Sequence, residues 1–156
     1  MQLKKLPIGI QTFSDIRKDD YVYVDKTDIA FNLIDSYRYA FLARPRRFGK
    51  SLFLDTLRNI FEGNKELFKG LAIEDKCDWN VSYPVITISF AEGKITSAKD
   101  LEDKFEEIFL LNQKKLDVTC QYKASDRRCF SELIRKANEK YNQNVVILVD
   151  EYDKPI

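Results

Sequence analysis

The chain has 156 residues and a mass of 18.3 kDa, enough for one domain with a hydrophobic core. Its 26 basic and 25 acidic residues leave a net charge of +1, so overall charge gives no reason to expect a nucleic-acid partner. It has no histidine and no Cys-x-x-Cys spacing among its three cysteines, which excludes Ser-His and Cys-His nucleophile pairs and argues against zinc sites and a disulfide framework.

The N-terminal residues 1–7 lack the apolar core of a signal peptide. No apolar run approaches the length needed to cross a membrane. We therefore expect a cytoplasmic protein with no membrane contact. Because no repeat, low-complexity tract or linker divides the chain, we expect a single domain over residues 1–156.

The first half of the chain predicts two strands and two helices. Residues 21–24 form a short β-prone run, and Thr27 or Asp28 is suited to cap the helix that follows. Residues 39–43 (Tyr-Ala-Phe-Leu-Ala) predict a buried strand that runs into a Gly-Lys-Ser turn. After that turn, apolar residues recur at helical spacing until Gly63, a natural helix stop: Phe53, Leu57, Ile60 and Phe61.

The second half alternates in the same way. Residues 84–90 predict a strand, with Pro84 at its tolerated first position. Ser97 and Asp100 resemble a capping box at the start of a helix, and a further helix is expected from near Ser125. The five aliphatic residues 145–149 predict a last strand, buried on both faces. Strands alternating with helices predict an α/β layered fold with a parallel sheet.

The segment 44–51 resembles a phosphate-binding loop. Gly49, Lys50 and Ser51 supply the last part of the pattern, in which helix N-terminal N–H groups and a lysine face phosphate and a hydroxyl binds Mg²⁺. Arg44 stands where the full pattern has glycine, and Pro45 has no N–H. The donors are then the amides of Arg47, Phe48, Gly49, Lys50 and Ser51. The alternative is a basic surface turn capped by Ser51.

Two carboxylates follow the last predicted strand. Asp150 and Glu151 lie at its C-terminal end, the edge where open α/β sheets bind ligands. We expect Asp150 to hold Mg²⁺ and Glu151 to polarise the attacking water. The alternative is an ordinary core strand that ends in solvated acids.

Together these motifs, with two N-terminal segments, resemble the AAA-ATPase-like family, a group of P-loop ATPases often fused to a C-terminal PD-(D/E)XK nuclease-like domain. The resemblance covers nearly the whole chain and rests on five segments: residues 5–9 (Lys-Leu-Pro-Ile-Gly), Phe13, residues 23–27 (Tyr-Val-Asp-Lys-Thr), residues 44–51 and residues 149–155. An Arg-Pro-Arg-Arg loop is usual in that family, so Arg44 is no departure from its relatives.

The resemblance implies a P-loop NTPase-like three-layer fold with a mostly parallel sheet, and ATP and Mg²⁺ as ligands. Five residues would then contact the nucleotide: Arg47, Phe48, Gly49, Lys50 and Ser51. Ser51 and Asp150 would lie at the metal, and Lys50 and Glu151 would act in catalysis. Arg46 and Arg47 would face phosphate, nucleic acid or solvent. For residues 23–27 we predict only a position near the adenine.

Relatives with such an acidic pair carry another strand, later in sequence, between the loop strand and the Asp-Glu strand. We therefore expect the sheet to be incomplete at the C-terminus of these 156 residues, and the chain to represent part of a longer ATPase with little turnover of its own. Any nucleic acid would be bound through the nuclease-like domain beyond it.

Three other functions stay open. The first is a nucleotide-dependent switch or scaffold without turnover. The second is a nucleic-acid-binding module that uses seven basic residues: Arg44, Arg46, Arg47, Arg58, Lys123, Arg127 and Arg128. The third, a small-molecule kinase, lacks an acceptor-site motif.

Overall fold

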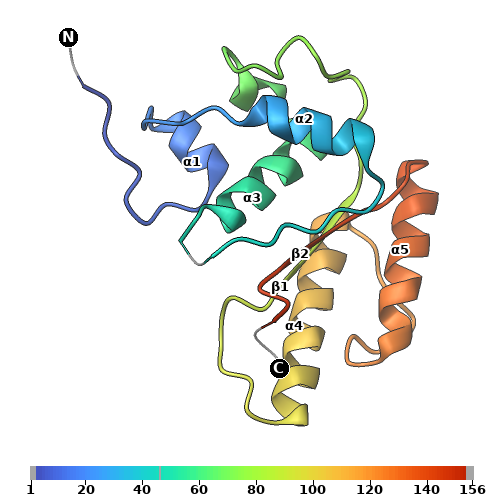
Figure 1. Cartoon of the computed structure of the whole chain (residues 1–156). Helices are drawn as coiled ribbons and strands as arrows, with labels where there is room; N and C mark the ends of the chain where they lie inside the picture. Colours follow the sequence, from blue (N-terminus) through green and yellow to red (C-terminus); the bar gives the residue numbers. More distant parts are fainter. Residues whose placement is uncertain (1–2, 46, 154–156) are drawn as a thin grey trace. The chain divides into compact units, whose positions relative to one another are not determined.

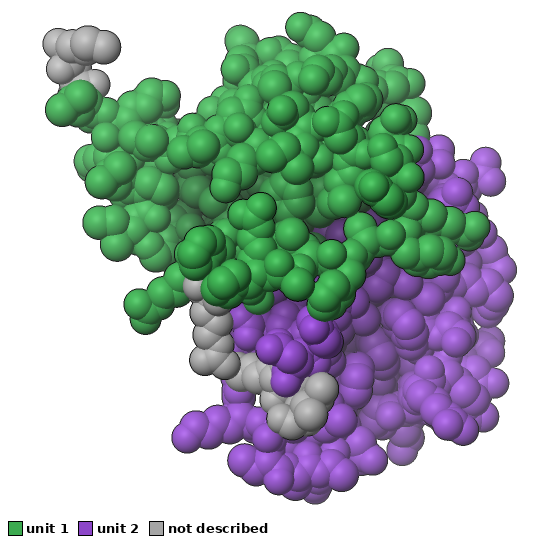
Figure 2. Space-filling model, viewed as in Figure 1, with its two compact units in different colours: residues 1–81 green, residues 82–156 purple. Residues whose placement is uncertain are grey.

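The structure is a computed structural model that describes residues 3–45 and 47–153. The chain divides into two compact units, residues 1–81 and residues 82–156, which are coloured separately in Figure 2. Figure 1 labels the helices and strands. In the described part of the chain, no helix is both long enough and apolar enough to span a membrane.

The first unit is helical. It contains α1 (Phe13–Lys18), α2 (Thr27–Ser36), α3 (Lys50–Phe61) and a short 3-10 helix, η1 (Lys65–Phe68). Helix α3 packs against α1 and α2, and α1 also packs against η1. The Phe68 ring stacks on Phe13 and on Trp79, with centroids 4.9 and 5.0 Å apart. These stacked rings join α1 to η1 and to the segment around Trp79.

The second unit is a two-layer arrangement of strands and helices. It contains β1 (Val85–Ser89), α4 (Ala98–Leu116), α5 (Arg127–Tyr141) and β2 (Val146–Asp150). The two strands pair in parallel, with Val85 opposite Val146 and Ser89 opposite Asp150. This pairing confirms the predicted α/β class with a parallel sheet. One core joins the sheet to both helices through Ile86, Ile88, Phe109, Cys129, Leu133 and Ala137, among others.

The helix boundaries follow local signals that the sequence displays. The capping box is formed as predicted, because the Ser97 hydroxyl accepts from the Asp100 N–H and the Asp100 carboxylate accepts from the Ser97 N–H. Helix α3 ends two residues before Gly63, whose φ of 75° suits a helix stop. Helix α5 begins near Ser125 as predicted, with Asp126 as its cap. One cap differs from prediction: Asp25, not Thr27 or Asp28, accepts the Thr27 N–H of α2.

Two predicted strands are absent. Residues 21–24 and 39–43 form no strand in the structure. In the first, the Val22 N–H donates to the Lys5 carbonyl and the Tyr21 N–H to the Ile16 carbonyl, and neither acceptor belongs to a strand. In the second, Tyr39 and Leu42 are 83% and 45% exposed. A β-prone run becomes a strand only where a neighbouring ladder accepts it, and the described sheet consists of β1 and β2.

The last strand forms as predicted but is not buried on both faces. Ile147 and Val149 are 41% and 45% exposed, while Leu148 is buried. In register they lie beside Ile86 and Ile88, so they share the face that α4 and α5 cover. Among the described strands β2 has a neighbour on one side only.

Candidate functional site

The first candidate site is the N-terminus of α3. The helix begins at Lys50, directly after Gly49, and no side chain among the described residues caps it. The Gly49 carbonyl accepts the Phe53 N–H at 2.9 Å, so regular helical bonding starts at this point. The N–H groups of the first turn precede that bond and have no partner within the helix. An uncapped helix start of this kind suits an anion.

The backbone directly before α3 has left-handed conformations, and the space at Gly49 is unoccupied. Gly49 has φ 74°, and a Cβ atom built there would meet no atom within 4 Å. Arg47 also has a positive φ, 66°, and it and Phe48 are exposed. Lys50 and Ser51 are half-buried at the helix start. Arg46, which was also predicted near phosphate, lies outside the described residues.

The second candidate site is the C-terminal end of β2. Asp150 is the last residue of the strand, and its carbonyl accepts the Phe90 N–H at 3.2 Å. Its carboxylate accepts the N–H of Glu151 at 3.0 Å. Ser89 of β1 lies opposite Asp150 in the register, so a hydroxyl and a carboxylate share this edge of the sheet. Ser89 was not among the predicted site residues, although parallel pairing of 84–90 with 145–149 places it at this edge.

Both candidate sites carry a non-glycine residue in the left-handed region. Five such residues occur in the described chain, and three of them end helices: Asp20, Asp117 and Asn142. The other two are Arg47 and Glu151, at φ 66° and 54°. This conformation costs an L-residue about 1–2 kcal/mol, and such strain concentrates at functional sites.

The donors at the two sites suit Mg²⁺ in chemical type. Ser51 offers a hydroxyl and Asp150 a carboxylate, and hard oxygen ligands are those that Mg²⁺ prefers. Within residues 3–45 and 47–153, no three Asp, Glu, Cys or His side chains cluster as a metal site would require.

Two of the basic residues considered for nucleic acid already have acidic partners. Arg58 pairs with Asp55 at 2.6 Å and with Glu62 at 3.3 Å. Arg128 pairs with Asp126 at 2.6 Å, and its hydrogen bonds hold the pKa of that carboxyl at about 2. A charge that is neutralised within the protein releases fewer counterions on binding a phosphate backbone, so these contacts weaken the case for a nucleic-acid module.

Residues 23–27 have a structural part in the first unit. The Asp25 carboxylate accepts from the Thr27 hydroxyl and from the Ala72 N–H, both at 2.7 Å, and the Thr27 hydroxyl accepts from the Ile73 N–H at 3.2 Å. Burial alone would raise the pKa of Asp25, but these hydrogen bonds outweigh it and lower that pKa below its ordinary value. The segment therefore ties the start of α2 to residues 72–73. Its position relative to adenine stays a prediction.

Comparison with known proteins gives one family and one similar curated sequence. The profile of a family described as predicted AAA-ATPase matches residues 7–156. An uncharacterized protein in the vnfD 5' region of Azotobacter chroococcum mcd 1 is 54% identical over 157 residues, covering 100% of this chain. The chain spans 30% of that relative's length. No solved structure matches the chain.

Proposed function

This chain belongs to the predicted AAA-ATPase family, and from that membership and the geometry of α3 we propose that it binds ATP with Mg²⁺ at the loop before α3. The family supports nucleotide binding in general. ATP as the nucleotide, Mg²⁺ as the metal, hydrolysis and the individual site residues are the proposal.

The loop residues divide the work by chemical type. The amides of Arg47, Phe48 and Gly49 donate to phosphate oxygens, aided by the positive end of the α3 dipole. The Lys50 ammonium adds a point charge on the β- and γ-phosphates. Ser51 places its hydroxyl one residue further into the helix, as a metal ligand. When bound, Mg²⁺ would neutralise charge on the phosphate oxygens.

The acidic pair completes the proposed site. Asp150 would hold the metal with its carboxylate, and Glu151 would accept a hydrogen bond from the attacking water and so polarise and orient it toward the γ-phosphate. The left-handed backbone at Glu151 turns the chain immediately after β2, so the two neighbouring carboxylates do not follow the alternation of a continued strand.

We also propose the fold that such a site needs. The parallel pair of β1 and β2, with α4 and α5 packed on it, would form part of the sheet of a three-layer P-loop NTPase fold.

One observation supports nucleotide binding above the others. Helix α3 starts without a side-chain cap directly after a left-handed glycine, and the space at that glycine is open. A surface turn of purely structural role would be expected to cap itself through Ser51, the alternative considered from the sequence. Ser51 makes no such cap, since it lies inside the helix.

Isothermal titration of the 156-residue chain with ATP, with and without Mg²⁺, tests the proposal. We expect saturable binding that strengthens with Mg²⁺ and a loss of at least about tenfold in affinity for Lys50→Ala, since a charged contact to phosphate is removed. Lys65→Ala is the matched control, because Lys65 is an exposed lysine of the same unit. Equal affinities for the wild type and both variants would contradict the proposal.

A further inference from the structure

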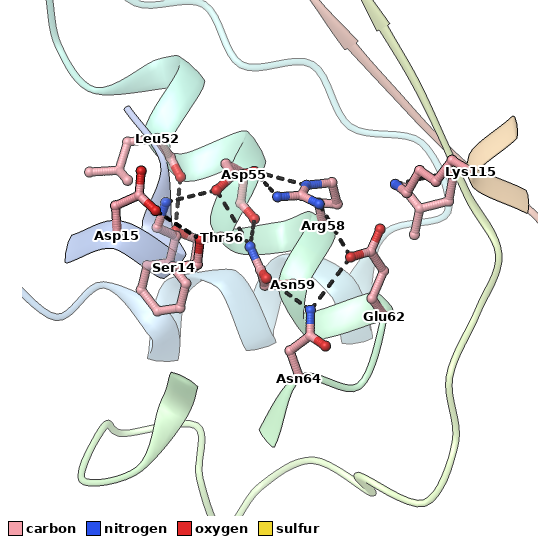
Figure 3. Close-up of polar contacts among 12 residues, drawn as sticks. Ser14, Asp15, Leu52, Asp55, Thr56, Arg58, Asn59, Glu62, Asn64 and Lys115 are labelled. Atoms are coloured by element: carbon pink, nitrogen blue, oxygen red, sulfur yellow. Dashed lines mark hydrogen bonds and ion pairs between the residues drawn. The ribbon is translucent and has the colours of Figure 1, made fainter. Parts of the chain in front are cut away.

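Asp55 lies on the helix that starts at the phosphate loop, one turn beyond it. It follows Ser51 by four residues, so it is on the same side of α3 and about 6 Å further along the axis. Its side chain is 18% exposed. No chemical part in nucleotide binding is assigned to it above, yet its carboxylate is one of the most heavily bonded groups in the first unit (Figure 3).

The Asp55 carboxylate joins α3 to α1. Its Oδ2 atom accepts the N–H of Phe13, the first residue of α1, at 2.7 Å across 42 residues of sequence. Helix α1 has no side-chain cap from its own N-cap residue, Thr12. Asp55 therefore satisfies an N–H that α1 leaves open, in the manner of an N-cap supplied by another helix.

The second carboxylate oxygen, Oδ1, accepts hydrogen bonds from a side chain of α3 itself. Oδ1 accepts from Arg58 Nη2 at 2.6 Å and from Arg58 Nε at 2.8 Å, and Asn59 Nδ2 lies 3.4 Å from Oδ2 (Figure 3). All the groups directed at Asp55 are hydrogen-bond donors, and three of them come from charged or backbone N–H groups. Only a carboxylate, which accepts on both oxygens, satisfies them together.

The next residue provides a parallel anchor. Thr56 is 1% exposed, donates to the Leu52 carbonyl at 2.8 Å and shares a hydrogen bond with the Tyr23 side chain. The Tyr23 ring in turn packs edge-on against Phe13, with centroids 5.2 Å apart. Two consecutive residues of α3 thus bind to the N-terminal part of the unit, and both connections lead to the surroundings of Phe13.

We propose that Asp55 is a positioning residue for the phosphate loop: by holding α3 against the start of α1, it fixes the direction in which the N–H groups at Gly49, Lys50 and Ser51 point. This inference rests on the proposed function. A helix transmits such a constraint because it is stiff over one turn, so a tilt at Asp55 changes the aim of amides only a few ångströms away.

The variant Asp55→Asn tests this role with the smallest change of shape. One amide oxygen still accepts, but the NH₂ group must face either the Phe13 N–H or Arg58, both of which are donors. Arg17→Gln is the matched control. Arg17 donates to the carbonyls of Leu67 and Lys69 at 2.7 and 2.6 Å, so its loss also loosens α1, but both of these acceptors lie outside α3.

Two readouts apply to the folded 156-residue chain. In ¹H–¹⁵N spectra without nucleotide, Asp55→Asn is expected to move the amide signals of Gly49, Lys50 and Ser51, whereas Arg17→Gln leaves them in place. With MgATP, Asp55→Asn is expected to weaken affinity about tenfold, the scale of one charge-assisted hydrogen bond, with Arg17→Gln near the wild type. Asp55→Glu, which keeps the charge but displaces the carboxylate, is expected to move the same signals and serves if Asp55→Asn does not fold.

The outcomes separate this inference from the proposed function. Loop signals that stay in place in a folded Asp55 variant would overturn the positioning role, and so would equal shifts in Arg17→Gln. If the wild type does not bind MgATP, the proposed function fails, and the nucleotide-free spectra still decide whether Asp55 orients the loop.

Discussion

Replacing Gly49 by alanine separates the backbone requirement of the loop from its requirement for open space. Gly49 has φ 74°, where an alanine costs about 1–2 kcal/mol relative to glycine. No atom lies within 4 Å of the position of the added Cβ, so packing contributes nothing further in the nucleotide-free protein. For a chain of this size, that cost corresponds to a fall in Tm of roughly 2–8 °C.

Binding of nucleotide should suffer more than stability does. A phosphate that accepts from the amides around Gly49 approaches the backbone closely, and a methyl group there occupies part of that space. We expect Gly49→Ala to lose at least about tenfold in ATP affinity, or 1.4 kcal/mol, beyond any effect of its lower stability.

Gly9→Ala provides the matched comparison. Gly9 is in the same unit, has φ 75° and also has nothing within 4 Å of its Cβ position. Its substitution should therefore lower Tm by a similar amount and leave ATP affinity unchanged. Thermal denaturation followed by circular dichroism and calorimetric titration with MgATP, at a temperature where all three proteins are folded, provide both measurements. ATP affinity that is equal in Gly49→Ala and the wild type, or that falls equally in both variants, would refute the reasoning.

Three further predictions concern the acidic pair, the second unit and the pH dependence of stability. Glu151→Gln should leave MgATP affinity within about twofold and abolish any phosphate release above background, because it removes only the water-polarising carboxylate; hydrolysis that persists would favour another base. Asn112→Ala should lower the unfolding free energy by about 2–4 kcal/mol in urea denaturation, because the Asn112 side chain accepts from the Thr87 N–H at 2.9 Å and donates to the Thr87 carbonyl at 2.8 Å. A change below about 0.5 kcal/mol would show that water replaces the Asn112 side chain as the partner of Thr87. The folded-state pKa of Asp25 lies below its ordinary value of 3.8, so Asp25 contributes stability that is present above pH 3.8 and is lost as pH falls through the folded-state pKa. We therefore expect the unfolding free energy of Asp25→Asn to fall less steeply than that of the wild type below pH 3.8. Identical pH profiles of the two proteins would contradict this.

The sequence by itself determined the features that depend on neighbouring residues. The start of α3 at Lys50 follows from a glycine that tolerates a left-handed φ next to a run of apolar residues at helical spacing. The capping box at Ser97 and Asp100 joins atoms three residues apart. The parallel class of the sheet follows from strands separated by helices, since a parallel connection needs a crossover of that length.

The tertiary structure decided whatever depends on a distant partner. Residues 39–43 have the composition of a strand but form none in the structure, because composition does not supply a neighbouring ladder. Ile147 and Val149 are as apolar as buried residues, yet they remain partly exposed because they lie where β2 has no described neighbour. Asp55 is an ordinary helix residue by sequence, and its bond to the Phe13 N–H, 42 residues away, exists only because folding brings α1 against α3. Hydrogen bonds across such separations leave no periodic signal, since neither residue alone indicates its partner.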